Sequence, residues 1–209
     1  MKITDLSLKD FTAKLGSDAP APGGGSAAAL SGALGAALVS MVCNLTKGRE
    51  KYAEFETLVV NTLKESDELA AALLEGIQKD TNAFDGVIAA YGMPKGTDAE
   101  KAARSEAIQS AYKVAILSPE ETADNCLAVM RLSRDLLHKS NKNAASDLAV
   151  SALQAYAGLI GALENVAINL AAIKDQNYVN DKRKWMDLAS DEGEKLLKEV
   201  REGVRAMLA

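Results

Sequence analysis

Residues 141–170 read NKNAASDLAVSALQAYAGLIGALENVAINL, and this stretch decides the fold. At 3.6 residues per turn, small and polar residues fall on one face of a predicted helix, and aliphatic residues flank them. The small and polar face consists of Asp147, Ser151, Ala155, Gly158, Ala162, Asn165 and Asn169. A helix that is apolar nearly all round belongs in a core, where its amides and carboxylate need a partner. Two interpretations follow: the face packs closely on a neighbouring helix, or it lines a ligand site. For the whole set we favour the site.

The rest of the chain has the composition of a helical protein. Hydrophobic residues make up 48% of the 209 residues and aromatic residues only 4%, which favours helices over strands. No linker rich in Pro, Gly or Ser divides the sequence, so we expect one domain, 1–209. The periodicity predicts an all-α bundle of about seven helices, several of them long, with a last amphipathic helix over residues 178–209.

Charge and cysteine content exclude several classes of protein. The net charge is −5 and no basic stripe carries interleaved aromatic residues, so we expect no nucleic-acid partner. Cys43 and Cys126 lie far apart in apolar contexts, which indicates a reducing, cytoplasmic location. Residues 23–45 are uncharged, but they are mostly Ala, Gly and Ser, so we expect packing against protein and no membrane partner. The single histidine, His138, has no second ligand at metal-binding spacing, and no metal site is predicted.

Gly23-Gly24-Gly25-Ser26 leads into one of the predicted helices. Free N–H groups and the positive end of a helix dipole favour an anion at such a start, and glycine lets a ligand approach the backbone. A helix start capped by Ser26 explains the same residues equally well.

Asp80 interrupts an apolar stripe that continues through Phe84 and Ile88 and that we expect to face the core. A carboxylate in that position needs a partner, and burial would raise its pKa towards the range of a general base. A salt bridge across the bundle is the alternative. Further along, Thr97 with Glu100, and Ser118 with Pro119, have the pattern of helix starts and predict two successive helices.

Several of these stretches together resemble successive motifs of the folate cyclodeaminase/cyclohydrolase family. The matching residues, in order, are Pro22 to Ser26, Asp80 with Ala83-Phe84, Pro94-Lys95, Arg104, Asn141 before Ser146-Asp147, and Asn165-Val166 before Ile168-Asn169-Leu170. The resemblance spans essentially the whole chain. One departure is Ser140, where the family pattern has glycine.

The resemblance implies an all-α bundle, usually a homodimer, that acts on a one-carbon group bridging N5 and N10 of tetrahydrofolate. It favours hydrolysis of 5,10-methenyltetrahydrofolate to 10-formyltetrahydrofolate, without a cofactor beyond the folate substrate. The alternatives are ammonia release from the formimino derivative, and a non-catalytic helical protein that binds folate or dimerises.

The residues suit that chemistry. Asp80 and Asp147 are the predicted catalytic carboxylates, and the sequence does not assign which is the base. Asn165 and Asn169 would orient the substrate through amide hydrogen bonds, while Gly23, Gly24, Gly25 and Ser26 would meet an anionic or carbonyl group. Lys95, Asn141 and Ser146 complete the predicted substrate-binding residues.

Overall fold

The computed structural model describes residues 2–209 and contains six α-helices and three short 3-10 helices in that range. The elements in chain order are η1 (Ile3–Asp5), α1 (Leu8–Leu15), α2 (Gly24–Asn44), η2 (Glu50–Phe55), α3 (Glu56–Tyr91), α4 (Asp98–Asp135), η3 (Lys142–Ala144), α5 (Ala145–Leu170) and α6 (Gln176–Leu208). The predicted all-α class with several long helices is therefore confirmed.

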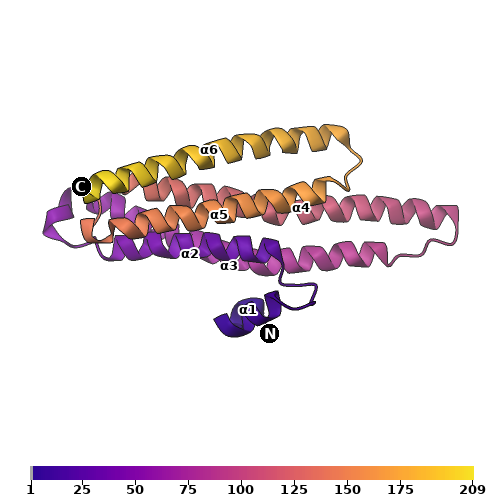
Figure 1. The fold of residues 1–209 in the computed structure, drawn as a ribbon. Coiled ribbons are helices and arrows are strands. Elements are labelled where there is room, and N and C mark those ends of the chain that lie inside the picture. Colours follow the sequence, from indigo (N-terminus) through magenta and orange to yellow (C-terminus); the bar gives the residue numbers. More distant parts are fainter. Residues whose placement is uncertain (1) are drawn as a thin grey trace.

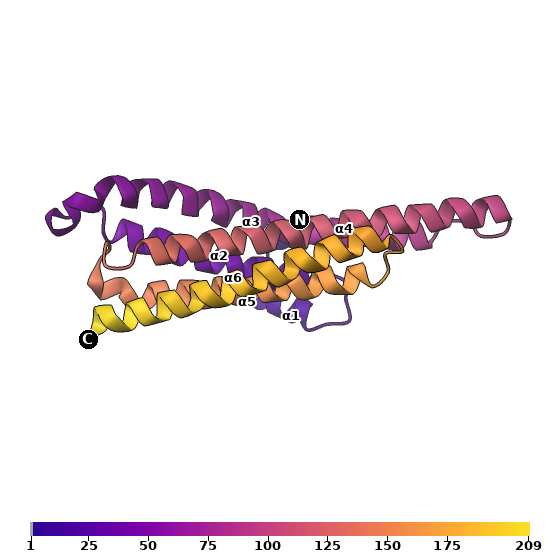
Figure 2. The ribbon, with the colours of Figure 1, turned by 90° about the horizontal axis from the view of Figure 1, so that it is seen from above.

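Helices α2 to α5 run alternately up and down and form the body of the bundle, while α6 lies along α4 and α5 (Figure 1). The turn that joins α3 to α4 extends well beyond the other helices, at the end opposite to the C-terminus (Figures 1 and 2). α1 lies to one side, where Ile3 and Phe11 pack on Ala29 of α2 and Ile77 of α3. This arm therefore covers the region where α2 begins.

Helices α2 and α5 approach each other closely because small residues face one another. A Cβ on Gly158 would lie 2.8 Å from the backbone oxygen of Ala28, and a Cβ on Gly35 would lie 2.9 Å from that of Ser151. The Ser151 hydroxyl donates to the Gly35 carbonyl at 2.8 Å. The middle of the small and polar face of α5 thus serves helix packing.

Helix α4 runs without a break through Pro119, so the prediction of two successive helices there was wrong. The proline ring removes one backbone donor. The helix continues because buried residues on both sides, Ile116 and Ala123, pack into the same bundle. The Ser118 hydroxyl also bonds the Gly76 carbonyl of α3 at 3.5 Å, which makes this turn part of a helix contact.

Two segments are long and apolar enough to cross a membrane by length and composition alone, Gly24–Asn44 and Lys142–Leu170. In the structure both are helices of the bundle, and 61% of the apolar window of the first is buried inside it.

Candidate active site

The N-terminus of α2 receives a carboxylate from the neighbouring helix α3. Gly23 is the N-cap residue and offers no side chain, so the first turn has unpaired N–H groups. Asp80 meets this turn: its Oδ2 accepts a hydrogen bond from the Ser26 hydroxyl at 3.0 Å, and the Ser26 backbone N–H also faces the carboxylate. Ser26, predicted as a helix cap, instead lies inside α2 and is fully buried.

Gly25 makes room for this carboxylate. A Cβ at Gly25 would lie 2.7 Å from the Asp80 Cγ, closer than real Cβ contacts allow. A Cβ at Gly23 would meet no atom within 4 Å. The glycine-rich sequence therefore admits a side chain of the protein itself at Gly25, and it leaves open space at Gly23.

Burial raises the pKa of the Asp80 carboxyl above its ordinary value, and the hydrogen bonds from Ser26 offset part of that effect. Among residues 2–209, no lysine, arginine or histidine lies within ion-pair distance of Asp80. The salt bridge considered from the sequence is thus not formed. Asp80 presents a partly desolvated negative charge with acceptor capacity to spare.

Two amides from the last turns of α5 face the same region. The Asn165 Nδ2 donates to the Gly161 carbonyl at 2.7 Å, and the Asn169 Nδ2 donates to the Asn165 carbonyl at 2.9 Å. These bonds within the helix use amide donors, and within residues 2–209 neither amide oxygen accepts a hydrogen bond. The Asn165 amide lies across from Gly24, 3.5 Å from where a Cβ would stand. Both oxygens are therefore available to a ligand.

A cavity of about 340 Å³ connects these groups. Its polar lining comes from the α2 start, Asp80, Thr81 and the two asparagines, and its remaining wall is largely apolar, formed by Pro20, Ala21, Ala83, Phe84, Val87, Tyr112, Ala115 and Ile168. Phe84 and Ile88 were predicted to point into the core, but they are 42% and 55% exposed. Beyond Asp80, α3 extends past the N-terminus of α2 and no longer packs on that helix. The apolar stripe of α3 therefore faces the cavity and the solvent there.

Tyr112 on α4 is a lining residue that the sequence did not single out. Its hydroxyl lies 3.3 Å from that of Tyr91, and the two rings meet edge to face with centroids 6.3 Å apart. The hydrogen bond to Tyr91, followed by burial, raises the pKa of the Tyr112 hydroxyl. In a chain with so few aromatic residues, a tyrosine in a long polar helix was the only available signal.

Three predicted site residues lie at the other end of α5. Asp147 is in its first turn, separated from Asn165 by five helical turns, or about 27 Å. Ser146 beside it is exposed. Asn141 is buried and fully engaged: its backbone N–H bonds the Thr46 hydroxyl, its Nδ2 bonds the Leu45 carbonyl, and its Oδ1 accepts from Asn143. The structure does not bring these three residues to the cavity.

The serine at position 140 fits its loop without strain. Ser140 has no positive φ, and its hydroxyl donates to the Leu136 carbonyl at 3.0 Å. The left-handed residue of this loop is His138, with φ of 61°. The absence of the family's glycine therefore leaves the loop conformation intact.

Lys95 lines a second cavity, next to the first and beyond the Tyr91–Tyr112 pair. In the part of the chain that the structure describes, residues 2–209, no group of three His, Cys, Asp or Glu side chains could hold a metal ion.

Comparisons with known proteins agree on one family. The family model described as formiminotransferase-cyclodeaminase matches residues 7–187. A methenyltetrahydrofolate cyclohydrolase of Methylorubrum extorquens is 45% identical over 181 residues, which cover 87% of each chain. The formimidoyltransferase-cyclodeaminase of Mus musculus is 34% identical over 84% of this chain, but the match spans only 32% of that longer protein.

The fold has a solved counterpart. The crystal structure of a formiminotetrahydrofolate cyclodeaminase from Thermotoga maritima superposes with a TM-score of 0.88 over the full length of both chains, at 26% identity. The matches in sequence and in structure lead to the same conclusion, which the order of the motifs had predicted: the chain belongs to the formiminotransferase-cyclodeaminase family.

Proposed function

We propose that this protein hydrolyses 5,10-methenyltetrahydrofolate to 10-formyltetrahydrofolate. One observation carries the proposal: Asp80 is a carboxylate of raised pKa, without a partner cation among residues 2–209, on the wall of a largely apolar cavity that also holds two amides whose oxygens accept no hydrogen bond within that range. The identity with the Methylorubrum extorquens cyclohydrolase supports the choice of reaction.

The charge of the substrate matches the charge of the cavity. The methenyl bridge is an amidinium cation, and Asp80 is the charged group among the lining residues. A cation next to a partly buried carboxylate offsets the penalty that burial imposes on it. The folate would therefore bind with its bridge beside Asp80, its pterin edge against the Asn165 and Asn169 amides, and its ring faces against Phe84 and Tyr112.

Asp80 is then placed to act as general base. It takes a proton from water as the water oxygen attacks the bridging carbon, and the product of this step is a neutral carbinolamine. Asp80 returns its proton to N5 as the bond between N5 and the bridging carbon breaks. The hydroxyl proton of the carbinolamine leaves to solvent, and the formyl group remains on N10. No step of this reaction requires a metal or a redox cofactor.

The outer face of α2 and α5 supports a homodimer. Large apolar side chains are exposed there, including Leu34 and Met41 on α2 and Val150 and Leu153 on α5, and α2 carries no charged residue. Apolar faces of this kind mark protein contacts. We propose that the protein is a homodimer in the cytoplasm. Light scattering would measure the molar mass of the wild type and of Leu34→Arg, and so test the dimer.

Ammonia release from the formimino derivative is the second candidate, because the Thermotoga maritima protein of the same fold is a formiminotetrahydrofolate cyclodeaminase. A general base and amide acceptors would serve either reaction. The two reactions differ in substrate and in whether ammonia is a product.

The deciding experiment follows loss of the methenyl chromophore with purified protein. We expect enzyme-dependent loss with methenyltetrahydrofolate, and ammonia release from formiminotetrahydrofolate that is slower by comparison. The reverse ratio would assign the chain to the cyclodeaminases. Turnover of neither substrate, with folate still bound in a calorimeter, would indicate a non-catalytic binding protein.

A further inference from the structure

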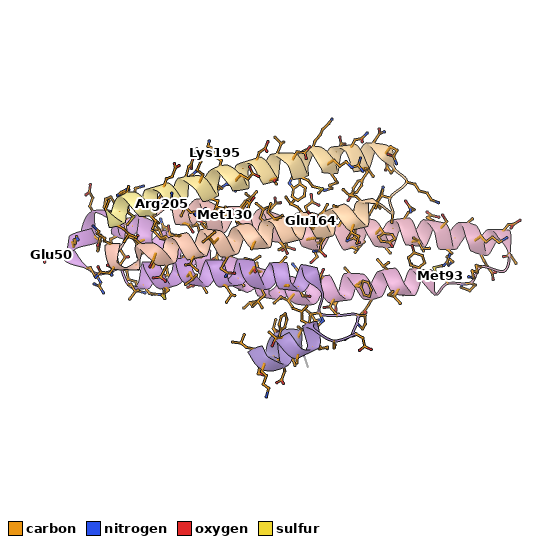
Figure 3. All side chains as sticks on the ribbon, in the orientation of Figure 1. Glu50, Met93, Met130, Glu164, Lys195 and Arg205 are labelled. Atoms are coloured by element: carbon orange, nitrogen blue, oxygen red, sulfur yellow. The ribbon has the colours of Figure 1, made fainter. Side chains whose placement is uncertain are left out.

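A third cavity, of about 290 Å³, lies at the end of the bundle where α5 begins. Three segments that are far apart in the sequence meet there: η2, the loop between α4 and α5, and the end of α6. Figure 3 labels Glu50 of η2 and Arg205 of α6 at this end. The lining residues are Lys51, Tyr52, His138, Ser140, Lys142, Ala206 and Met207. None of them is a carboxylate, although the chain as a whole has a net charge of −5.

The basic residues of this cavity have no internal counter-ion. Within residues 2–209, no carboxylate lies within ion-pair distance of Lys51, His138 or Lys142. The Lys51 ammonium lies over the ring of Tyr52, 5.5 Å from its centroid, and so stays beside the cavity. The His138 imidazole can donate a hydrogen bond in either of its charge states. The cavity therefore offers two positive charges and a ring N–H to a ligand.

Tyr52 carries a hydroxyl proton that the described part of the protein does not use. The residue is only 8% exposed, and its hydroxyl oxygen accepts a hydrogen bond from the Lys142 backbone N–H at 3.1 Å. Among residues 2–209, no group accepts the proton of this hydroxyl. A donor in a buried side chain costs free energy when it has no acceptor. An anion in the cavity would supply the acceptor.

The loop between α4 and α5 is held in place around this cavity. Asn141 fixes it to the end of α2, because its backbone N–H donates to the Thr46 hydroxyl at 2.9 Å and its Nδ2 donates to the Leu45 carbonyl at 3.1 Å. The His138 N–H donates to the Met207 sulfur of α6 at 3.3 Å, and His138 has a φ of 61°, which few residues other than glycine adopt. A loop that is already ordered loses little entropy when it binds a ligand.

We propose that this third cavity binds a phosphate group, either inorganic phosphate or the phosphoryl group of a small metabolite. A phosphate monoester carries a charge of about −1.5 to −2 at pH 7, which two lysines match. Its three strong acceptor oxygens suit the hydroxyl of Tyr52 and the imidazole of His138 as donors. The proposal does not depend on the folate reaction proposed above, because the two cavities share no residue.

The same basic residues have a second explanation, which the test must separate from a phosphate site. Helix α6 ends at Leu208, and cations near the C-terminal end of a helix interact favourably with its dipole. Under that explanation His138 and Lys142 stabilise the fold by themselves, and no anion is needed. Under our proposal the stabilisation grows with the phosphate concentration, because a ligand that binds only the folded state raises its stability by mass action.

The test titrates the purified protein with inorganic phosphate in a calorimeter, at an ionic strength held constant with sodium chloride. One variant is Tyr52→Phe, and the other, the lysine pair, combines Lys51→Gln with Lys142→Gln. The matched control combines Lys9→Gln with Lys184→Gln, two exposed lysines outside the cavity. We expect one phosphate site in the wild type and the control. Tyr52→Phe should raise Kd roughly 10- to 150-fold, the value of a hydrogen bond to a charged group, and the lysine pair should raise it roughly 2- to 30-fold.

Melting temperatures provide a second measurement on the same proteins. Phosphate also stabilises proteins in general through exclusion from their surface, so the measure is the difference between the rise in the control and the rise in the lysine pair. We expect the smaller rise in the lysine pair, which should fold because Lys51 and Lys142 are both exposed.

Glycerol 3-phosphate then distinguishes the two sources of the phosphate group. Tighter binding than that of inorganic phosphate would assign the cavity to a phosphorylated metabolite, and weaker binding would assign it to inorganic phosphate. Equal Kd values for inorganic phosphate in the lysine pair and the control would overturn the proposal. A melting temperature that falls in the lysine pair by the same amount with and without phosphate would also overturn it, and would assign the lysines to the end of α6.

Discussion

Asn141 lies just before α5 and Asn165 lies near the end of that helix. Both carry the same amide side chain, but the two amides have different hydrogen-bond partners. Both donor and acceptor of the Asn141 amide are used, and they fasten the end of α2 to the start of α5. Asn165 uses its donor inside its own helix and leaves its oxygen facing the cavity. An asparagine near the core is therefore better judged by whether its amide oxygen is free than by how deeply it is buried. A free oxygen favours a role in ligand binding, and a bonded one favours a structural role.

The same comparison separates the two aspartates. Asp80 lies on the cavity wall next to the α2 start, whereas Asp147 lies in the first turn of α5 at the far end of the bundle. An acidic residue in the first turn of a helix interacts favourably with the positive end of the helix dipole, and this interaction accounts for Asp147 without a ligand. We therefore propose Asp80 as the base.

The largest expected effect comes from removing the Asp80 charge. Asp80→Asn should lower kcat by roughly 10²–10⁴-fold, the usual contribution of a general base, because the amide cannot take the proton of the attacking water. Asp147→Asn is the matched change at the other end of α5 and should leave kcat within a few-fold of the wild type. Turnover and melting temperature of both variants would be measured. Near-normal turnover of Asp80→Asn would remove this carboxylate from the mechanism.

The second largest effect should come from Gly25→Ala. The new Cβ would displace the Asp80 carboxylate, since it would stand 2.7 Å from the Cγ, and a misplacement of this kind lowers turnover roughly 10²-fold. Overpacking should also lower the free energy of unfolding by about 1–3 kcal/mol. The measurements are kcat and chemical denaturation.

Gly23→Ala is the control for this change, because a Cβ there meets no neighbour. It should lower the free energy of unfolding by less than Gly25→Ala does, because it loses only the preference for glycine over alanine at the N-cap position. Equal destabilisation by the two alanines would mean that backbone freedom at the start of α2, and not space for Asp80, explains the glycines.

A smaller effect is expected for the two asparagines. Asn165→Ala should raise KM roughly 2- to 10-fold, the value of one hydrogen bond to the substrate, with little change in stability. Asn141→Ala should show the opposite pattern: it leaves the Leu45 carbonyl and the Asn143 N–H without their side-chain partner and should destabilise the fold by about 1–3 kcal/mol with KM unchanged. Kinetics and denaturation of both variants would test the comparison directly, and a shared pattern would contradict it.

Composition and periodicity were enough to predict the helical class, because an aromatic-poor chain rich in Ala and Leu has few residues that favour strands. Asp80 stood out because a carboxylate on an apolar stripe needs an explanation. Asn165 and Asn169 stood out through their spacing of one turn. These signals are local, so the sequence contains them.

The sequence pattern is least informative where position along a helix matters as well as its face. Asp147 shares a face with Asn165, but five turns separate them, and periodicity is silent about which neighbour each turn meets. Phe84 and Ile88 continue the stripe of the buried Ile77. They are nevertheless exposed, because α3 extends beyond the helices that cover Ile77. Tyr112 of α4 becomes a lining residue only because α3 packs beside it and completes the cavity. Such tertiary information is absent from a single helix pattern.

The smallest expected effect is a shift in the pH dependence, and it tests the link between α2 and Asp80. Burial raises the pKa of Asp80, so the carboxylate that we propose as the base forms only as the pH rises through that raised value, and kcat/KM should increase over the same range. The free energy of unfolding should change in the opposite direction as the pH rises. Between the ordinary and the raised pKa the folded state binds more protons than the unfolded state, so the free energy of unfolding falls as the pH rises through this window. Asp80→Asn should abolish this slope.

Ser26→Ala sharpens the same test, because it removes the hydroxyl that donates to the ionised carboxylate and thereby raises the pKa of Asp80 further. The acidic limb of the kcat/KM profile should move to higher pH, while turnover at high pH recovers towards the wild-type value. Ser146→Ala, an exposed serine in the first turn of α5, is the control and should leave the profile in place. A simple structural role for Ser26 would lower the melting temperature without moving the limb. An unmoved limb in Ser26→Ala would therefore show that the group titrating in kcat/KM is not Asp80.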